Sequence, residues 1–233
     1  MIRGLAIETS GRLGSVALAV DGQVVAEDQF PHGLQHAAEI IPRIDALCKT
    51  HGWTPADIAE VYVSTGPGSF TGLRIGVTLA KTMAFATGAR LVAVPSAKVL
   101  AYNAPVEAER VLIVLDAKRD QVFTARLARN GDGHWLFEQE PHLASLAAAL
   151  DLSPRPVHLL GEGIPYHQKF IPSGDAGVIV TSPDRWTARA AVAATVGFQM
   201  AREGAFTSPD TLLPVYIRKP EAEEKWDAAQ TVR

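Results

Sequence analysis

A short strand, a glycine-rich loop and a long helix in direct succession constrain the fold of this chain more than any other stretch. The run Val61-Tyr-Val-Ser-Thr65 is β-branched and aromatic, and the loop Gly66-Pro-Gly-Ser-Phe-Thr-Gly72 follows it. This order is typical of a parallel strand that leads through a tight turn into a crossover helix. The loop is therefore expected at the carboxyl end of a strand, where open α/β sheets hold their ligands.

The loop matches neither of two common phosphate-binding motifs. Gly66, Gly68 and Thr71 lack the third glycine of the dinucleotide fingerprint, and Gly72 precedes Leu73-Arg74 rather than the Lys-Ser/Thr of a Walker A loop. Ser69 or Thr71 is expected to cap the helix. The loop could present free amides to an anion or serve only as a strand-to-helix turn, and the residues leave both readings open.

The helix expected over residues 73–87 has an unusually wide apolar arc. At about 100° per residue, its apolar side chains cover roughly 200° of the circumference, which is more than one buried face requires. Within this arc the small residues recur at every fourth position, namely Gly72, Gly76, Ala80 and Ala84. Such a row would let a second helix approach closely, or it would pack on the parent sheet.

The same order of elements is predicted twice along the chain. Residues 5–9, 15–20 and 23–30 are expected as strands joined by tight turns, followed by a helix over 34–51 that Pro42 should kink. A short helix over 96–103, capped by Ser96, is expected to close the first unit. After the polar segment 104–110, the strand run and its acidic end at Asp116 start again.

Two units are therefore predicted, over residues 1–104 and 105–233. The second should be smaller, with strands near 157–160 and 177–181, a helix near 143–150 and another over 188–202. The chain is expected to return to the first unit near 211–218. Its last fifteen residues are charged and unpatterned, and they are expected to form a loose tail.

Composition limits the partners that this chain can bind directly. Its 22 basic and 25 acidic residues give a formal charge of 22 − 25 = −3, so a nucleic-acid role should run through a partner protein. The single cysteine, Cys48, lies on an apolar helical face and is expected to be a reduced core residue. No run of eighteen apolar residues or signal peptide is found, so we expect a cytoplasmic protein without a membrane partner.

Several motifs together resemble a known superfamily and one family within it. These are Leu5-Ala-Ile-Glu-Thr-Ser10, the glycine loop, Leu115-Asp-Ala-Lys118, Gly161-Glu-Gly163 and Pro214-Val-Tyr-Ile-Arg218. With the duplicated β-β-β-α-β-α order, they resemble the actin, sugar kinase and Hsp70 (ASKHA) superfamily, and within it the bacterial TsaB (YeaZ) family. The resemblance implies an α/β fold with two such lobes, of which the second is reduced.

The resemblance also implies a function. Members of this group, also labelled M22 glycoproteases, are the non-catalytic partners of the paralogue TsaD and work with the ATPase TsaE. Together these proteins form N6-threonylcarbamoyladenosine at position 37 of tRNAs that read ANN codons. It implies that this chain needs no cofactor by itself, that ATP and metal belong to the partner subunits, and that tRNA is reached through the complex.

The resemblance implies a four-helix interface with TsaD. When the chain is isolated, the same surface is expected to bind a second copy and form a homodimer. The interface should use the two long helices of the first unit, through His36, Ile40, Ile44, Gly72, Gly76, Ala80, Met83 and Ala84. An exposed apolar patch of this kind would otherwise face water.

The residues indicate a remnant nucleotide cleft rather than a working one. Where the catalytic paralogue has a metal-binding histidine pair, this chain has Ser96 and Leu100, and Glu8 replaces the aspartate of the first strand. The expected remnant cleft comprises Glu8, Thr9, Ser10, Gly11, Gly68, Asp116, Gly161 and Gly163, which would also suit a set of turn residues. No metal site or catalytic residue is predicted. The alternative function is a small ATP-dependent sugar or acid kinase of the same superfamily.

Overall fold

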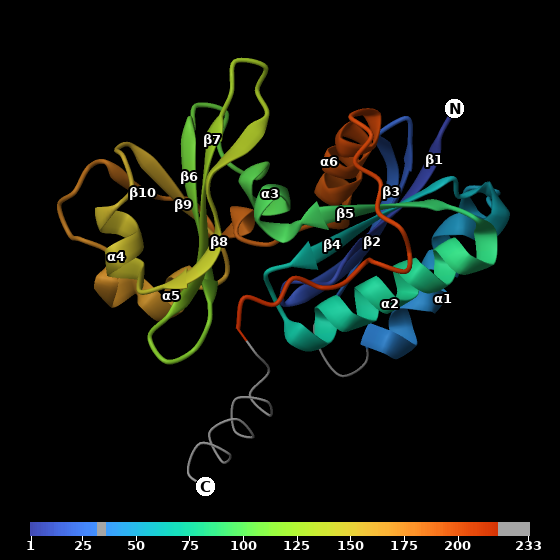
Figure 1. Cartoon of the computed structure of the whole chain (residues 1–233), viewed down its shortest axis with the longest axis horizontal. Helices are drawn as coiled ribbons and strands as arrows, with labels where there is room; N and C mark the ends of the chain where they lie inside the picture. The colour runs from blue at the N-terminus through green and yellow to red at the C-terminus, as the bar shows by residue number, and fades with distance from the viewer. Residues whose placement is uncertain (32–35, 219–233) are drawn as a thin grey trace, which may run out of the picture.

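The protein contains two five-stranded mixed sheets that lie side by side, as the computed structural model in Figure 1 shows. The structure describes residues 1–31 and 36–218. The strand orders are β3-β2-β1-β4-β5 and β10-β9-β6-β7-β8. When the second order is read from its other edge, both sheets have their third, second, first, fourth and fifth strands side by side in that sequence. The predicted duplicated α/β fold is confirmed.

The first unit contains β1 (Arg3–Glu8), β2 (Leu13–Val20), β3 (Gln23–Pro31), α1 (His36–Thr50), β4 (Glu60–Gly66), α2 (Phe70–Thr87), β5 (Arg90–Pro95) and α3 (Ser96–Ala101). The second contains β6 (Arg110–Asp116), β7 (Val122–Arg129), β8 (Trp135–Ala144), α4 (Leu146–Asp151), β9 (Val157–Leu160), α5 (Ile164–His167), β10 (Val178–Val180) and α6 (Ala190–Arg202). In each sheet the first strand pairs antiparallel with the second and parallel with the fourth. This pairing places Glu8 and Asp116, the last residues of β1 and β6, at corresponding points.

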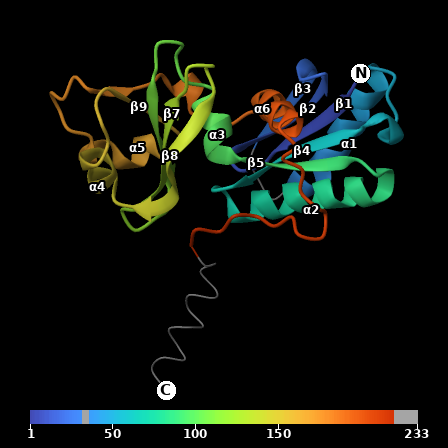
Figure 2. The same cartoon turned by 45° about the horizontal axis from the view of Figure 1, so that its top comes forward.

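The central strands β1 and β4 of the first sheet are buried on both faces because helices cover that sheet from both sides. In β1, Leu5 and Ile7 point to the core beneath α1 and α2, while Ala6 points to a core between the two sheets. The central core is shared, since it contains Ala6 of the first sheet and Ile113 of the second. Figure 2 shows α3 within this middle layer. The two units are thus joined by a common core.

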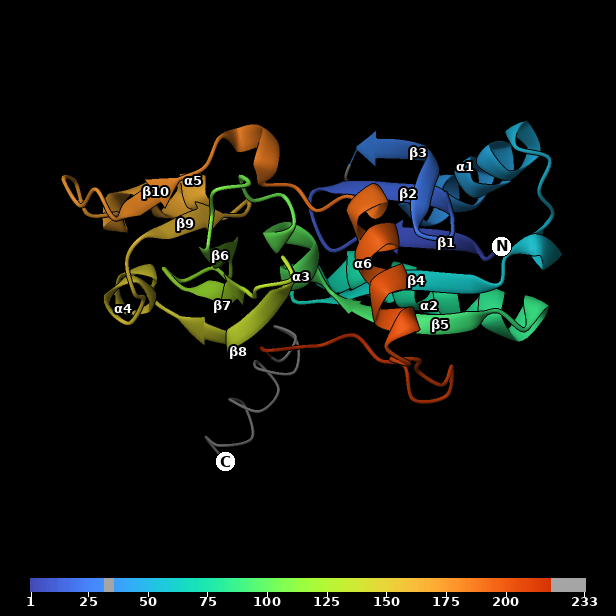
Figure 3. The same ribbon diagram turned by 90° about the horizontal axis from the view of Figure 1, so that it is seen from above.

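Helix α6 follows the second sheet in the sequence but packs on the first, across the face opposite α1 and α2 (Figure 3). It approaches closely because its buried residues are small, and a Cβ placed on Gly197 would lie 2.6 Å from the Tyr62 side chain. Its first amides are bonded by the first unit: Ala191 N donates to Glu27 Oε1 at 2.9 Å, and Ala190 N to Ser15 Oγ at 2.8 Å. The sequence predicted that the chain returns to the first unit near residues 211–218. It already does so with α6, earlier in the chain.

Local signals predicted most turns and caps correctly. Asp21 and Gly22 have φ of 49° and 79°, as a tight hairpin turn requires, and Ser69 caps α2 by accepting a bond from Gly72 N at 3.3 Å. The cap assigned to Ser96 is wrong. Ser96 is the first residue of α3, and its hydroxyl accepts a bond from Gly66 N at 3.1 Å instead. Ser96 thereby ties the glycine loop to the end of β5.

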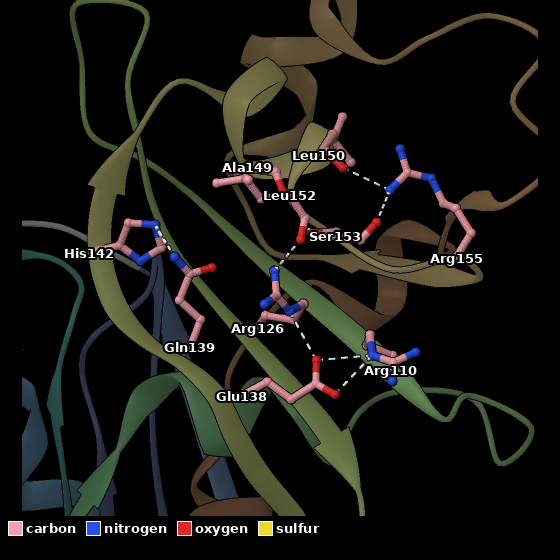
Figure 4. Close-up of polar contacts among 10 residues, drawn as sticks. All are labelled: Arg110, Arg126, Glu138, Gln139, His142, Ala149, Leu150, Leu152, Ser153 and Arg155. Atoms are coloured by element: carbon pink, nitrogen blue, oxygen red, sulfur yellow. Dashed lines mark hydrogen bonds and ion pairs between the residues drawn. The ribbon is translucent and has the colours of Figure 1, made fainter.

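The short helix α4 depends on side chains from neighbouring segments (Figure 4). Six residues form little helix by themselves. Here the Arg126 guanidinium donates to Leu152 O at 2.9 Å and that of Arg155 donates to Leu150 O at 2.8 Å, so two cations bond the carbonyl groups at the helix end. Glu138 bonds both Arg110 and Arg126, and these bonds hold the Arg126 side chain in place.

Among the described helices, none is long and apolar enough to cross a lipid bilayer.

Candidate functional site

The glycine loop closes directly onto the turn that follows β1. Ser69 N donates to Ser10 O at 2.7 Å, and the Thr9 hydroxyl donates to Gly72 O at 2.8 Å. A Cβ on Gly72 would lie 2.0 Å from Thr9 O, and one on Gly68 would lie 2.3 Å from Ser10 O. This close backbone contact requires glycine at positions 68 and 72. The Ser69 amide and the Gly72 carbonyl of the loop are already bonded within the chain.

Glu8 lies beneath this contact and is fully buried. Its Oε1 accepts a bond from Ser10 N at 2.6 Å, and its Oε2 accepts one from the Ser64 hydroxyl. Burial raises the pKa of the Glu8 carboxyl, and the bonds from Ser10 and Ser64 offset only part of this rise. The carboxyl therefore supports the first turn from within the core.

A cleft of about 350 Å³ opens between the carboxyl ends of the two sheets, and we call it the inter-sheet cleft. Four predicted cleft residues line it, namely Ser10, Gly11, Gly68 and Asp116. Glu8 and Thr9 are instead buried. Gly161 and Gly163 pack on β6, where added Cβ atoms would lie 2.3 Å from Val114 O and 2.6 Å from Asp116 N. These two glycines allow the loop after β9 to approach β6.

Asp116 is held by groups of its own unit. Its Oδ1 bonds Lys118 N at 3.1 Å and His167 Nε2 at 3.2 Å, and its Oδ2 pairs with Lys118 Nζ at 2.9 Å. Burial by itself would raise the pKa of Asp116, but the hydrogen bonds from Lys118 and His167 outweigh burial and lower it. Asp116 is therefore the more acidic of the two carboxyls that end the first strands.

Three further residues connect the two sides of the inter-sheet cleft, and the sequence predictions missed them. Arg12 N donates to Glu162 Oε2 at 2.9 Å, and the Arg12 guanidinium bonds the Tyr166 hydroxyl and lies 4.9 Å from the centre of its ring. Glu162 stands between the two glycines of the Gly161-Glu-Gly163 motif, so its position in that motif was the available signal. The Glu162 carboxylate accepts a hydrogen bond from the Arg12 amide, so this amide is not available to bind an external anion.

The outer face of the first unit carries a second concavity, between α1 and α2. This α1–α2 groove has a volume of about 350 Å³ and is lined by Ile40, Ile41, Arg74, Ile75, Thr78, Leu79 and Thr82. Ile41 is 58% exposed, and Ile75 and Leu79 are half-buried. A predominantly apolar concavity on two long helices is suited to contact with another protein.

The row of small residues on α2 does not form this groove. A Cβ on Gly76 would lie 2.4 Å from Thr9 Oγ1, and Ala80 and Ala84 are buried in the core that contains Leu5 and Ile7. The assignment of Gly72, Gly76, Ala80 and Ala84 to the partner interface is therefore corrected, because this row packs on its own sheet.

The other predicted interface residues have mixed positions. Ile40 is buried at the base of the groove, Ile44 is buried in the core, and Met83 is half-buried against that core. The side chain of His36 lies outside the described part of the structure. Among the predicted interface residues with described side chains, Ile40 alone lines the groove, and the other lining residues are its neighbours along the same two helices.

The two residues expected to correspond to the paralogue's histidine pair are both buried. Ser96 bonds Gly66 N, and Leu100 is packed in the core between the sheets. Across residues 1–31 and 36–218, no group of three or more His, Cys, Asp or Glu side chains is placed to hold a metal ion.

Known proteins match the chain over most of its length. The family model for TsaD, described as tRNA N6-adenosine threonylcarbamoyltransferase, matches residues 32–176. The tRNA threonylcarbamoyladenosine biosynthesis protein TsaB of Bacillus subtilis (strain 168) is 33% identical over 97% of this chain and 98% of its own. The protein of the same name from Escherichia coli (strain K12) is 29% identical over 96% of this chain and 98% of its own.

A solved structure has the same fold. The structure titled YeaZ from Pseudomonas aeruginosa superposes with a TM-score of 0.77 at 24% identity, covering 93% of this chain and all of that one. At 24% identity this match shows a shared fold, and the 33% identity to the Bacillus protein over nearly the whole of both sequences shows the family. On these matches, this chain belongs to the TsaB (YeaZ) family.

Proposed function

We propose that this protein is a non-catalytic scaffold subunit for the formation of N6-threonylcarbamoyladenosine in tRNA. It would act in the cytoplasm with a TsaD paralogue and the ATPase TsaE, on position 37 of tRNAs that read ANN codons. The names of its relatives support the pathway. The observation that carries the scaffold role is the apolar α1–α2 groove, which lies on the opposite side of the first sheet from the core shared with the second.

The groove suits a helical partner. Ile41, Ile75 and Leu79 provide apolar contact area, Thr78 and Thr82 leave room beside them, and Arg74 adds a charge at the edge. An equivalent pair of helices on TsaD would complete a four-helix contact. In the absence of TsaD, a second copy of this chain would cover the same surface in an isologous dimer.

The inter-sheet cleft favours a structural role over phosphoryl transfer. Glu8 is engaged with Ser10 and Ser64, and the amide of Arg12 is engaged with Glu162. We therefore expect ATP and metal to be bound by the partner subunits. The kinase alternative gains no support from these contacts, and calorimetric titration of the isolated protein with ATP and magnesium tests it directly: micromolar binding would favour the kinase.

The scaffold proposal is tested by reconstitution. The Leu79→Asp variant places a charge in the groove, so we expect loss of TsaD binding and of tRNA modification by the reconstituted TsaB–TsaD–TsaE system, with the fold retained. Leu152→Asp is the matched control, since Leu152 is 68% exposed on the second unit. Full modification with Leu79→Asp, or modification by this protein with TsaD omitted, would refute the proposal.

A further inference from the structure

The segment after α6 runs back along the first unit and ends at the second (Figure 1). We call residues 207–218 the strap. It begins beside β5, where Thr207 N donates to Leu91 O at 2.9 Å, and Leu212 is buried in the core beneath α1 and α2. Val215 N donates to Thr65 O at 2.7 Å at the end of β4. Finally, the Arg218 guanidinium bonds Ala117 O and Gln121 Oε1 of the turn after β6.

These contacts hold the strap backbone but leave three apolar side chains facing outward. Leu213 is 69% exposed, Val215 48% and Tyr216 41%. The Leu212 side chain and the Val215 amide fix the backbone beside all three. A segment held in this way loses little conformational freedom when its side chains are covered by a partner.

The strap is continuous with the α1–α2 groove. The centres of the Tyr216 and Phe70 rings lie 4.9 Å apart at the start of α2, and the Arg74 guanidinium lies 4.9 Å from the centre of the Phe70 ring. Arg74 also lines the groove. Arg74, Phe70 and Tyr216 thus connect the two exposed apolar regions, and tyrosine and arginine are the residue types that most often dominate binding energy in interfaces.

We infer that the strap, through Leu213, Val215 and Tyr216, forms part of the surface that binds the TsaD-type partner. The inference rests on the proposed function and extends it beyond the two helices. A partner seated in the groove would have to cover Arg74, and the Phe70 and Tyr216 rings lie next to it. Because the strap also bonds the end of β4 and the turn after β6, the partner would contact a segment attached to both sheets.

The test compares substitutions in the strap and in the groove. Binding to the purified TsaD paralogue of the same organism is measured by isothermal titration for Val215→Ser/Tyr216→Ser. We expect at least about a ten-fold increase in Kd. Phe206→Ser is the matched control, since Phe206 is 37% exposed and stacks on Arg90 near the other end of the strap. Its Kd should stay within about two-fold of the wild type.

The outcomes separate this inference from the proposal on which it rests. If Leu79→Asp abolishes binding while the strap variant binds as the wild type does, the strap inference is wrong and the groove remains. If Leu79→Asp also leaves binding unchanged, the proposed function fails. A strap variant that alters only self-association, measured by sedimentation velocity without TsaD, would assign the strap to the homodimer and overturn the inference.

A second measurement does not depend on the variants keeping the strap in place. In the wild-type protein, addition of TsaD should slow hydrogen exchange in residues 213–217 together with the exchange of α1 and α2. Protection of α1 and α2 without protection of 213–217 would overturn the inference. Exchange of the residue 215 amide, which bonds Thr65 O, also reports whether the strap stays attached in the double variant.

Discussion

The two sheets share one strand order, but the helices that cover their outer faces differ greatly in length. Helices α1 and α2 have 15 and 18 residues, whereas α4 and α5, which follow the corresponding strands of the second unit, have 6 and 4. Long helices bury one side against the sheet and still present another side to a partner. Among the described helices on the two outer faces, only α1 and α2 are therefore long enough to form a groove of this kind.

The first strands of the two units also end in carboxyls with opposite properties. Burial raises the pKa of Glu8 despite the hydrogen bonds from Ser10 and Ser64, whereas the bonds from Lys118 and His167 outweigh burial at Asp116 and lower its pKa. The same point of the fold thus supports a buried structural carboxyl in one unit and a charged one in the other. The comparison of the two units suggests four tests.

The largest effect is expected from charges placed on the two sides of α2. Ala80→Glu buries a carboxylate in the core beside Leu5 and Ile7, so the free energy of unfolding should fall by about 3 kcal/mol or more. Thr78→Glu is the matched control, because Thr78 is exposed at the groove, and its effect should stay within about 0.5 kcal/mol. Urea denaturation followed by circular dichroism measures both. A stable, folded Ala80→Glu monomer would show that the small row does face a partner.

A smaller loss is expected when the first unit no longer caps α6. Glu27→Ala removes the carboxylate that accepts bonds from Ala191 N and from Arg189, so unfolding should become easier by about 1–2 kcal/mol. Glu109→Ala, at an exposed position, is the control. Denaturation by urea gives the size of the loss, and hydrogen exchange locates it. If α6 amides kept their protection in Glu27→Ala, the cap would not be what fixes this helix.

The two strand-end carboxyls should give opposite dependences of stability on pH. The raised pKa of Glu8 means that its contribution is full below the ordinary value of 4.5 and is lost as the pH rises through the folded-state pKa. Glu8→Gln can keep both hydrogen bonds, so this variant should gain stability relative to the wild type as the pH rises.

For Asp116 the sign is reversed. Its contribution is present above the ordinary value of 3.8 and is lost as the pH falls through the lowered folded-state pKa. Asp116→Asn should therefore be less stable than the wild type by about 1 kcal/mol near neutral pH, and this deficit should shrink in acid. Urea denaturation from about pH 3 to about pH 7 tests both variants. Parallel pH profiles for the two would contradict the assigned surroundings.

The smallest effect concerns the support of α4. Arg126→Met keeps much of the side-chain stem but removes the bonds to Leu152 O and Glu138, which should cost about 0.5–1 kcal/mol. Hydrogen exchange should become faster in α4 and stay unchanged in α1, which serves as the internal control. Equal acceleration in both helices would mean that Arg126 affects the whole fold rather than this helix end.

Local sequence patterns determined much of the fold. Apolar periodicity and glycine punctuation placed the strands of both units, the long helices and the Asp21-Gly22 turn, because these features depend on contacts within a few residues. Several boundaries moved where the signal was weak: β8 extends to Ala144, into the segment expected to begin a helix. The duplicated order of elements along the chain also followed from the sequence, because the second unit repeats the pattern of the first.

Only the tertiary structure decided which side of each helix is exposed. The apolar arc of α2 is wide enough to face a sheet and a partner at once, so the sequence could not separate Ala80, which packs on β1, from Leu79, which lines the groove. Likewise, Arg12 and Glu162 are 150 positions apart and meet only because the two sheets share one core. Contacts of such long range depend on how complete elements pack together, which local spacing does not encode.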